Sequence, residues 1–160
     1  MNTYRVVGVA TALAFSMLLQ NSVKAADEKV GGGWTTNYAA AAEKAKKEQK
    51  AILLEFTGSD WCGWCIKLKE EVFDKKEFKD WAAKHAVLVE VDFPRGKEQS
   101  AELIKQNQEL SDKFPVEGYP TVVVLNSNGL KLGELGYLEG GPDAWSKACD
   151  AILKNTAASK

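Results

Sequence analysis

The sequence predicts an α/β domain in which a mixed central β-sheet carries helices on both faces. Three short apolar runs have the length of buried strands, at residues 51–56, 86–92 and 120–125. Segments of helix-forming residues separate these runs. The Asn-Ser-Asn-Gly sequence at 126–129 predicts a hairpin turn that leads to a fourth strand at 131–137. A strand–helix–strand crossover followed by a hairpin gives a sheet with both parallel and antiparallel pairs.

Helices are expected in five segments, most of them with a local signal in the sequence. The first is an Ala-rich run of strong helix formers. The third is expected to begin at Asp74, which forms a capping box with Glu77, and the fourth at Ser100, a preferred N-cap residue. The fifth follows a chain break at 140–142 and places Trp145 on an apolar stripe. The expected ranges are 34–49, 66–73, 74–84, 100–113 and 143–154.

The first 25 residues differ from the rest of the chain. They contain two basic residues and no acidic one, and an apolar stretch of 14 residues occupies positions 6–19. A basic start, a short apolar core and an end of small residues predict a secretory signal peptide at 1–25, cleaved after Ala25 or Ala26. The alternative is a membrane anchor, which needs about 20 apolar residues. We therefore expect a periplasmic or otherwise exported protein with no membrane span after cleavage.

The residues after the signal peptide have the composition of one globular domain. The chain has 160 residues, of which 45% are apolar, and a formal net charge of −1. This charge argues against a nucleic acid partner, which requires a clustered excess of Lys and Arg. Residues 26–33 are polar and Gly-rich and are expected to form a flexible lead-in to a domain at 34–156. No added dimerisation segment is evident, so we expect a monomer.

The chain contains three cysteines, of which Cys62 and Cys65 form a Cys-x-x-Cys pair. This spacing fits either half of a zinc site or a redox-active pair. Zinc needs four ligands, and the chain has only one other cysteine, Cys149, and one histidine, His85. Haem attachment requires a histidine after the second cysteine, where this chain has Ile66. The residue types favour redox chemistry and leave a metal site as the alternative.

The position of the pair in the predicted fold strengthens the redox interpretation. Cys62 follows a strand and a tight turn, and it opens a helix. Unpaired N–H groups and the helix dipole favour a thiolate at such a position. The thiolate is the nucleophile that attacks a partner disulfide, and Cys65, one helical turn later, is placed to displace the mixed disulfide.

Two motifs resemble the thioredoxin superfamily. The run WCGWC at 61–65 follows an apolar strand, and GYPT at 118–121 precedes another. The longer run FTGSDWCGWC at 56–65, with EEVF at 70–73, resembles the exported bacterial thioredoxin-like branch. The resemblance extends over residues 34–153. It implies a thioredoxin-like fold and a thiol–disulfide oxidoreductase that uses its redox-active disulfide without a cofactor or metal.

The resemblance also implies roles for single residues. Cys62 matches the attacking cysteine, Cys65 the resolving cysteine, and Pro120 the proline that the family holds in a cis peptide bond. Glu55 lies near the position of a buried acid that relays protons to the resolving cysteine, and a carboxyl in an apolar strand has a raised pKa. Two departures count against this role, because the turn before Cys62 is one residue longer and the strand at 86–91 lacks the accompanying lysine. The alternative for Glu55 is a strand-end acid facing solvent.

The residues around the pair are expected to line a substrate groove. Trp61 precedes the pair, while Gly63 and Trp64 lie between its cysteines. Trp64 stands where ordinary thioredoxin has proline, and Gly followed by an aromatic residue resembles the dipeptide of disulfide isomerases. Tyr119 is expected to present its backbone to an extended substrate, with Pro120 packed over the cysteines.

Three functions are consistent with these features. The leading one is reduction or isomerisation of disulfides in exported proteins, with a membrane or periplasmic thiol reductant to recycle the pair. The second is a dedicated electron relay for one exported partner, and the third is a redox-inert binding or chaperone domain. Cys149 is expected to be a small core residue and His85 to be structural, so neither is assigned a catalytic role.

Overall fold

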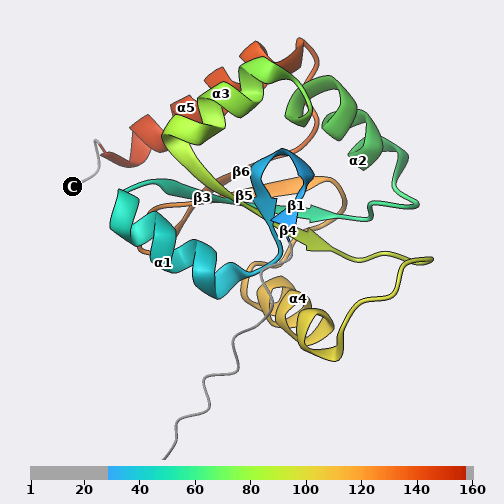
Figure 1. Cartoon of the computed structure of the whole chain (residues 1–160). Coiled ribbons are helices and arrows are strands. Elements are labelled where there is room, and N and C mark those ends of the chain that lie inside the picture. The colour runs from blue at the N-terminus through green and yellow to red at the C-terminus, as the bar shows by residue number, and fades with distance from the viewer. Residues whose placement is uncertain (1–28, 158–160) are drawn as a thin grey trace, which may run out of the picture.

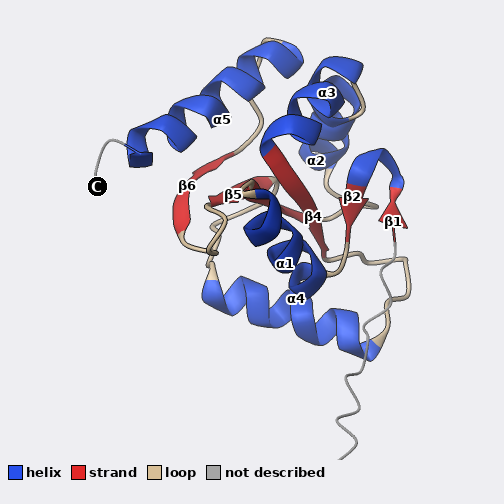
Figure 2. Cartoon of the chain, turned by 60° about the vertical axis from the view of Figure 1, so that its left-hand side comes forward, coloured by secondary structure: helices blue, strands red, loops and turns tan. Residues whose placement is uncertain are grey.

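The computed structural model describes residues 29–157 (Figure 1). The signal peptide expected at 1–25 and its cleavage site lie outside these described residues. Within them, a six-stranded sheet has the order β1-β2-β4-β3-β5-β6 and carries helices on both faces (Figure 2). The predicted α/β class with a mixed central sheet is therefore confirmed. The strands are β1 (Lys29–Val30), β2 (Trp34–Thr35), β3 (Ala51–Thr57), β4 (Ala86–Asp92), β5 (Thr121–Leu125) and β6 (Lys131–Leu135).

The central strand β3 has a parallel neighbour on one side and an antiparallel neighbour on the other. It pairs with β4 in parallel and with β5 antiparallel. The strand β2 extends the parallel part of the sheet, and β6 extends the antiparallel part. In this register Glu55 lies between Glu90 of β4 and Val122 of β5. The carboxyl end of β3, which leads to the cysteine pair, is thus held by strands on both sides.

Helices cover both faces of the sheet. Side chains alternate between the two faces of each strand, so each face carries apolar residues that pack against helices. The helices are α1 (Tyr38–Glu48), α2 (Gly63–Leu68), the π-helical segment η2 (Lys69–Phe73), α3 (Lys76–His85), α4 (Ala101–Lys113) and α5 (Gly141–Ala157). Figure 2 shows α2, α3 and α5 on one side of the sheet and α1 and α4 on the other. On the side of α2, α3 and α5, Leu53 packs in a core with Phe73 and Trp145. Leu54 packs in the opposite core with Leu110.

The start of α1 differs from the prediction. Trp34 and Thr35 form β2, which pairs with β4, and the helix begins only at Tyr38. The side chain of Asn37 sets this boundary, because its Oδ1 accepts a hydrogen bond of 3.0 Å from the N–H of Ala40. Part of the segment expected as a lead-in, 26–33, also takes regular structure, as β1 and a 3₁₀ turn at Gly31–Gly33.

The predicted capping box at the start of α3 is wrong. Asp74 ends η2, and its carboxylate forms an ion pair of 3.0 Å with Lys69. The N-cap of α3 is Lys75, which has extended backbone angles and makes no side-chain capping bond. Because Asp74 is held by the preceding turn, it is not free to cap the next helix. Among the described helices, none is both long enough and apolar enough to cross a membrane.

Candidate functional site

The cysteine pair lies where the chain leaves β3 and enters α2. Cys62 and Cys65 form a disulfide with their Cα atoms 5.2 Å apart. Cys62 is the N-cap of α2, and its Sγ accepts a hydrogen bond of 3.2 Å from the N–H of Cys65. Cys62 is 7% exposed and Cys65 2%. Cys62 is therefore the more exposed residue of the pair, and its sulfur already receives a backbone N–H that would stabilise a thiolate.

The turn that precedes Cys62 depends on Gly58. The carbonyl oxygen of Gly58 accepts hydrogen bonds from the N–H groups of Trp61 and Cys62, at 3.1 and 2.8 Å. The indole of Trp61 lies directly over Gly58, so a Cβ atom added there would be 2.4 Å from its Cε2. Only glycine leaves room for this arrangement.

Two carboxylates attach this turn to the loop that follows β4. Asp92 accepts hydrogen bonds from the N–H of Ser59 at 2.8 Å and from its Oγ at 2.5 Å. Asp60 accepts hydrogen bonds from the N–H groups of Arg95 and Gly96, and these bonds hold the pKa of Asp60 below its ordinary value. The negative charge of Asp60 is thus engaged by backbone amides of the neighbouring loop.

Trp61 is fixed on one side of the pair. Its Nε1 donates a hydrogen bond of 2.8 Å to the carbonyl oxygen of Phe93. The guanidinium of Arg95 lies 4.1 Å from the centre of the indole, a cation–π contact. The ring of Tyr119 lies 6.0 Å from that of Trp61 and stacks on Phe93 at 5.7 Å. The two motifs found in the sequence therefore meet through Trp61 and Tyr119.

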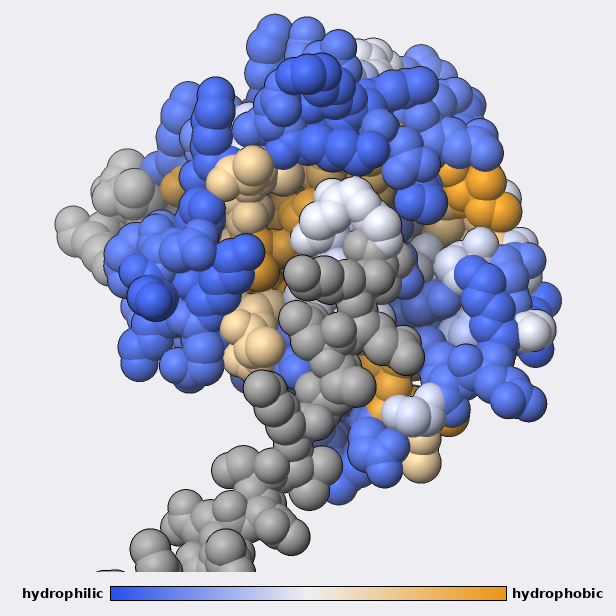
Figure 3. Space-filling model, viewed as in Figure 1, coloured by the Kyte–Doolittle hydropathy of each residue, from blue (hydrophilic) through white to orange (hydrophobic). Residues whose placement is uncertain are grey.

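Trp64 forms a second aromatic group on the outer side of α2. It is 59% exposed, and its ring lies 5.3 Å from that of Tyr137. The ammonium of Lys67 lies 5.0 Å from the Trp64 ring and 4.8 Å from the Tyr137 ring. The hydroxyl of Tyr137 donates a hydrogen bond of 2.5 Å to Glu71. Figure 3 shows that the surface in this view is largely hydrophilic, with apolar residues exposed in a few small areas.

The Tyr119–Pro120 peptide bond is cis. The turn that contains it leads directly into β5, whose first residue Thr121 lies opposite Phe56 of β3. The hydroxyl of Thr121 donates a hydrogen bond of 2.8 Å to the carbonyl oxygen of Gly118, which closes the turn. Both motifs thus lie at the same end of the sheet.

Glu55 is buried beneath α2. It is 5% exposed, so the alternative of an acid that faces solvent is wrong. Leu53, two residues earlier on β3, contacts the same core as Leu68 of α2, and alternation places Glu55 on that face. Burial, and next the charge of Glu90, raise the pKa of Glu55 to about 8. The carboxyl group therefore retains its proton at neutral pH.

Cys149 and His85, the two residues that a metal site would need, lie elsewhere in the fold. Cys149 is fully buried in the core with Trp145, and burial raises the pKa of its thiol to about 12. The imidazole of His85 stacks on Trp81 at 5.3 Å. Over residues 29–157, no group of three or more His, Cys, Asp or Glu side chains is placed to bind a metal ion.

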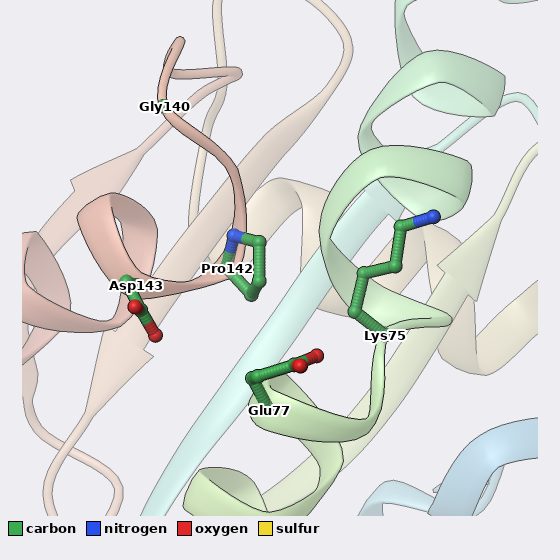
Figure 4. Close-up of a pocket in the computed structure, with 5 residues that line it drawn as sticks. All are labelled: Lys75, Glu77, Gly140, Pro142 and Asp143. Carbon is green, nitrogen blue, oxygen red and sulfur yellow. The ribbon is translucent and has the colours of Figure 1, made fainter.

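A hollow of about 300 Å³ lies between the starts of α3 and α5. Lys75 and Glu77 face Pro142 and Asp143 across it, with Gly140 above (Figure 4). None of the site residues predicted from the sequence lines this hollow.

The sequence did not indicate three residues that the fold brings to the site. Arg95 is 30 or more residues from the pair, yet its guanidinium covers Trp61. Lys67 follows Cys65 by two positions, but its contact with both aromatic rings depends on Tyr137, which follows β6. No local signal distinguishes these residues, because their contacts exist only after the sheet has formed.

Residues 38–152 match a family described as a thioredoxin-like domain. The chain belongs to the thioredoxin-like family. It is 41% identical over 118 residues to a protein of Chlamydia pneumoniae named disulfide bond reductase DsbH, covering 74% of this chain and 71% of DsbH. A thioredoxin-related protein of that organism, DsbJ, is 30% identical over 121 residues, which are 74% of this chain and 35% of DsbJ.

Solved structures agree with this assignment. A structure described as DsbH oxidoreductase is 37% identical and superposes with a TM-score of 0.72, covering 86% of this chain and 92% of that one. A thioredoxin from Thermus thermophilus, 18% identical, shows the same fold with a TM-score of 0.58 over 79% of this chain and 92% of that one. The family works through a redox-active disulfide without a cofactor. The thioredoxin-like chain is thus a thiol–disulfide oxidoreductase.

Proposed function

We propose that this protein is an exported disulfide reductase in which Cys62 attacks and Cys65 resolves. The observation that carries the proposal is the placement of Cys62, the more exposed cysteine of the pair, as the N-cap of α2 with the N–H of Cys65 directed at its sulfur. A negative charge at that sulfur is favoured by the helix start. The similarity to DsbH, named a disulfide bond reductase, supports this direction of electron flow.

In the proposed reaction, the Cys62 thiolate attacks a substrate disulfide, and one substrate sulfur leaves as a thiolate. A mixed disulfide then joins Cys62 to the substrate. Cys65 loses its proton, attacks the Sγ of Cys62 and releases the second substrate thiolate. Two electrons pass to the substrate, and the Cys62–Cys65 disulfide forms. A thiol reductant returns two electrons to the pair.

Glu55 is proposed as the group that carries the proton of Cys65. Its pKa of about 8 lies near neutral pH, where a carboxyl group can both hold and release a proton. While the disulfide is intact, Glu55 holds the proton. When the reductant opens the disulfide at Cys62, Glu55 gives the proton to Cys65, and it takes the proton back when Cys65 resolves a mixed disulfide.

The aromatic residues beside the pair are proposed to contact the substrate. Trp61 and Trp64 are both exposed, and a Cβ atom added at Gly63 would meet only open space. Tyr119, with Pro120, is proposed to offer its backbone to an extended segment that carries the disulfide. This arrangement suits unfolded or flexible chains, because such segments adopt an extended conformation easily.

The location and partners follow from the predicted signal peptide. We propose that the mature protein is a monomer in the periplasm or another exported location. Its substrates there would be exported proteins with disulfides, and a membrane or periplasmic thiol reductant would recycle it. The relatives named DsbH and DsbJ support a role among Dsb-type redox proteins.

Reduction of insulin disulfides tests the activity. The full-length mature chain, Cys62→Ser and the control Cys149→Ala are compared with the same thiol reductant. We expect Cys62→Ser to reduce insulin no faster than the reductant alone and Cys149→Ala to retain activity, since Cys149 is buried away from the pair. Equal activity of wild type and Cys62→Ser would refute the proposal.

Trapping with Cys65→Ala tests the substrate range, because this variant cannot resolve its mixed disulfides. Many adducts from a periplasmic extract indicate a general reductase. A single dominant adduct indicates a dedicated relay and contradicts the broad range proposed here.

A further inference from the structure

The structure places a second carboxyl group beside Glu55. Glu90 occupies the position of β4 that is paired in register with Glu55 of β3. Neighbouring strands are about 4.8 Å apart, so two side chains on the same face of paired positions are adjacent. Leu53 and Leu88, which precede the two glutamates by two residues, lie in the same core, and both carboxyl groups therefore project towards the α2 side. Glu55 is buried and Glu90 half-buried.

We propose that Glu90 is a positioning residue for proton transfer, whose carboxylate keeps the proton on Glu55 and makes ionised Glu55 a stronger base towards Cys65. This inference rests on the proposed redox cycle and adds to it a residue that contacts neither the sulfurs nor the substrate. Two carboxylates in a poorly solvated site do not ionise together readily, because their charges repel. The more buried one, Glu55, is the one that retains the proton.

The surrounding cations offset this repulsion only in part, because they are engaged by other groups. The η2 segment supplies Lys69, but its ammonium is paired with Asp74 at 3.0 Å. From β4 and its loop come Asp92, whose carboxylate accepts two hydrogen bonds from Ser59, and Lys97, whose ammonium donates to the Ser59 hydroxyl. None of the ion pairs found among residues 29–157 includes Glu55 or Glu90.

The direction of the pKa values agrees with this geometry. Burial raises the pKa of Glu55, and the charge of Glu90 is the next largest cause. The pKa of Glu90 is itself raised, by burial and then by the charge of Asp92. The cations Lys69 and Lys97 act in the opposite direction on this group. Because the two groups are coupled, their titration steps belong to the pair.

The proton balance of the redox cycle then depends on Glu90. Opening of the disulfide by the thiol reductant transfers the proton of Glu55 to the departing Cys65 sulfur. Glu55 and Glu90 are then both ionised and adjacent. Their repulsion is relieved when Cys65 attacks the mixed disulfide and returns its proton to Glu55. Glu90 thus favours the resolving step, which completes reduction of the substrate.

Two measurements on the oxidised and reduced protein test the proposal. Carboxyl ¹³C NMR gives the titration midpoint of Glu55 in the oxidised wild type, in Glu90→Gln and in Glu90→Asp. We expect Glu90→Gln to lower this midpoint by on the order of one pH unit, because the neighbouring charge is lost. Glu90→Asp, which keeps a carboxylate, should restore part of the difference. The matched control is Glu70→Gln, an exposed glutamate, which should leave the midpoint of Glu55 unchanged.

The second measurement is the pH dependence of the resolving step. An aromatic mixed disulfide is formed at Cys62 of the reduced protein with a chromogenic aryl disulfide, and release of the aryl thiolate by Cys65 is followed in a stopped-flow instrument. We expect the pH profile of Glu90→Gln to shift to lower pH by the same amount as the Glu55 midpoint. The plateau rate at high pH should fall several-fold, because Glu55 is then a weaker base.

The outcomes separate this proposal from the proposed function. An unchanged Glu55 midpoint in Glu90→Gln overturns the carboxyl pair. A midpoint that moves without a matching shift of the pH–rate profile overturns the role of Glu90 in proton transfer. Equal insulin reduction by wild type and Cys62→Ser refutes the reductase instead, whereas the titration of the oxidised protein does not depend on any substrate.

Discussion

Replacing Glu55 by glutamine should make the oxidised protein more stable at high pH. The folded protein binds the Glu55 proton up to a pKa of about 8, whereas the ordinary value is 4.5. Between these two values unfolding releases a proton, so the free energy of unfolding falls as pH rises. At about 1.4 kcal/mol per pH unit, the full window corresponds to roughly 5 kcal/mol. Glutamine cannot ionise and removes this loss.

Urea unfolding of the disulfide-bonded protein, followed by tryptophan fluorescence at pH 5, 7 and 9, measures the effect. We expect the stability of Glu55→Gln relative to wild type to increase by several kcal/mol from pH 5 to pH 9, with most of the increase below pH 8. Glu70→Gln is the control, because it removes an exposed glutamate near the same helix. A stability difference that is constant over this pH range would refute the reasoning, since it would mean that Glu55 ionises in the fold as it does in the unfolded chain.

Two further predictions follow from the same structure. Gly58→Ala should displace the Trp61 indole and destabilise the protein by about 1–3 kcal/mol in urea unfolding, as overpacking does. Gly63→Ala, where an added Cβ meets open space, should cost less, and an equal effect of both would contradict the close approach at Gly58. Native Cys149 should resist iodoacetamide at pH 8, because its thiol is buried and its pKa is about 12. Mass spectrometry should find it modified only after unfolding, and modification of the native protein would contradict its burial.

The central strands of the fold were predictable from the sequence because their signals are continuous and local. The apolar runs at 51–56, 86–92 and 120–125 coincide closely with β3, β4 and β5. The strands β1 and β2 were missed because each has only two residues, too few for a pattern. The capping box at Asp74 was wrong because its ion pair with Lys69 belongs to the preceding helical segment.

The candidate site was predictable only where it lies in one stretch of chain. Cys62, Cys65 and Trp61 share a motif, and their spacing is itself the signal. The burial of Glu55 depends on the strands at both of its sides, so the sequence left solvent exposure open as an alternative. The pairing of Glu55 with Glu90 requires the register of β3 against β4, which no local pattern specifies.

Two carboxylates attach the turn before Cys62 to the end of β4 and the loop after it. Because of these bonds, this loop tolerates an insertion less well than other loops of the protein. Asp92 holds Ser59 from the end of β4, and Asp60 accepts hydrogen bonds from Arg95 and Gly96, so the loop at 93–97 supports the turn that carries the nucleophile. An insertion there would separate the amides of Arg95 and Gly96 from Asp60. The hairpin turn at 126–129 makes no such connection, so an affinity tag or a fluorescent label is better placed at that turn.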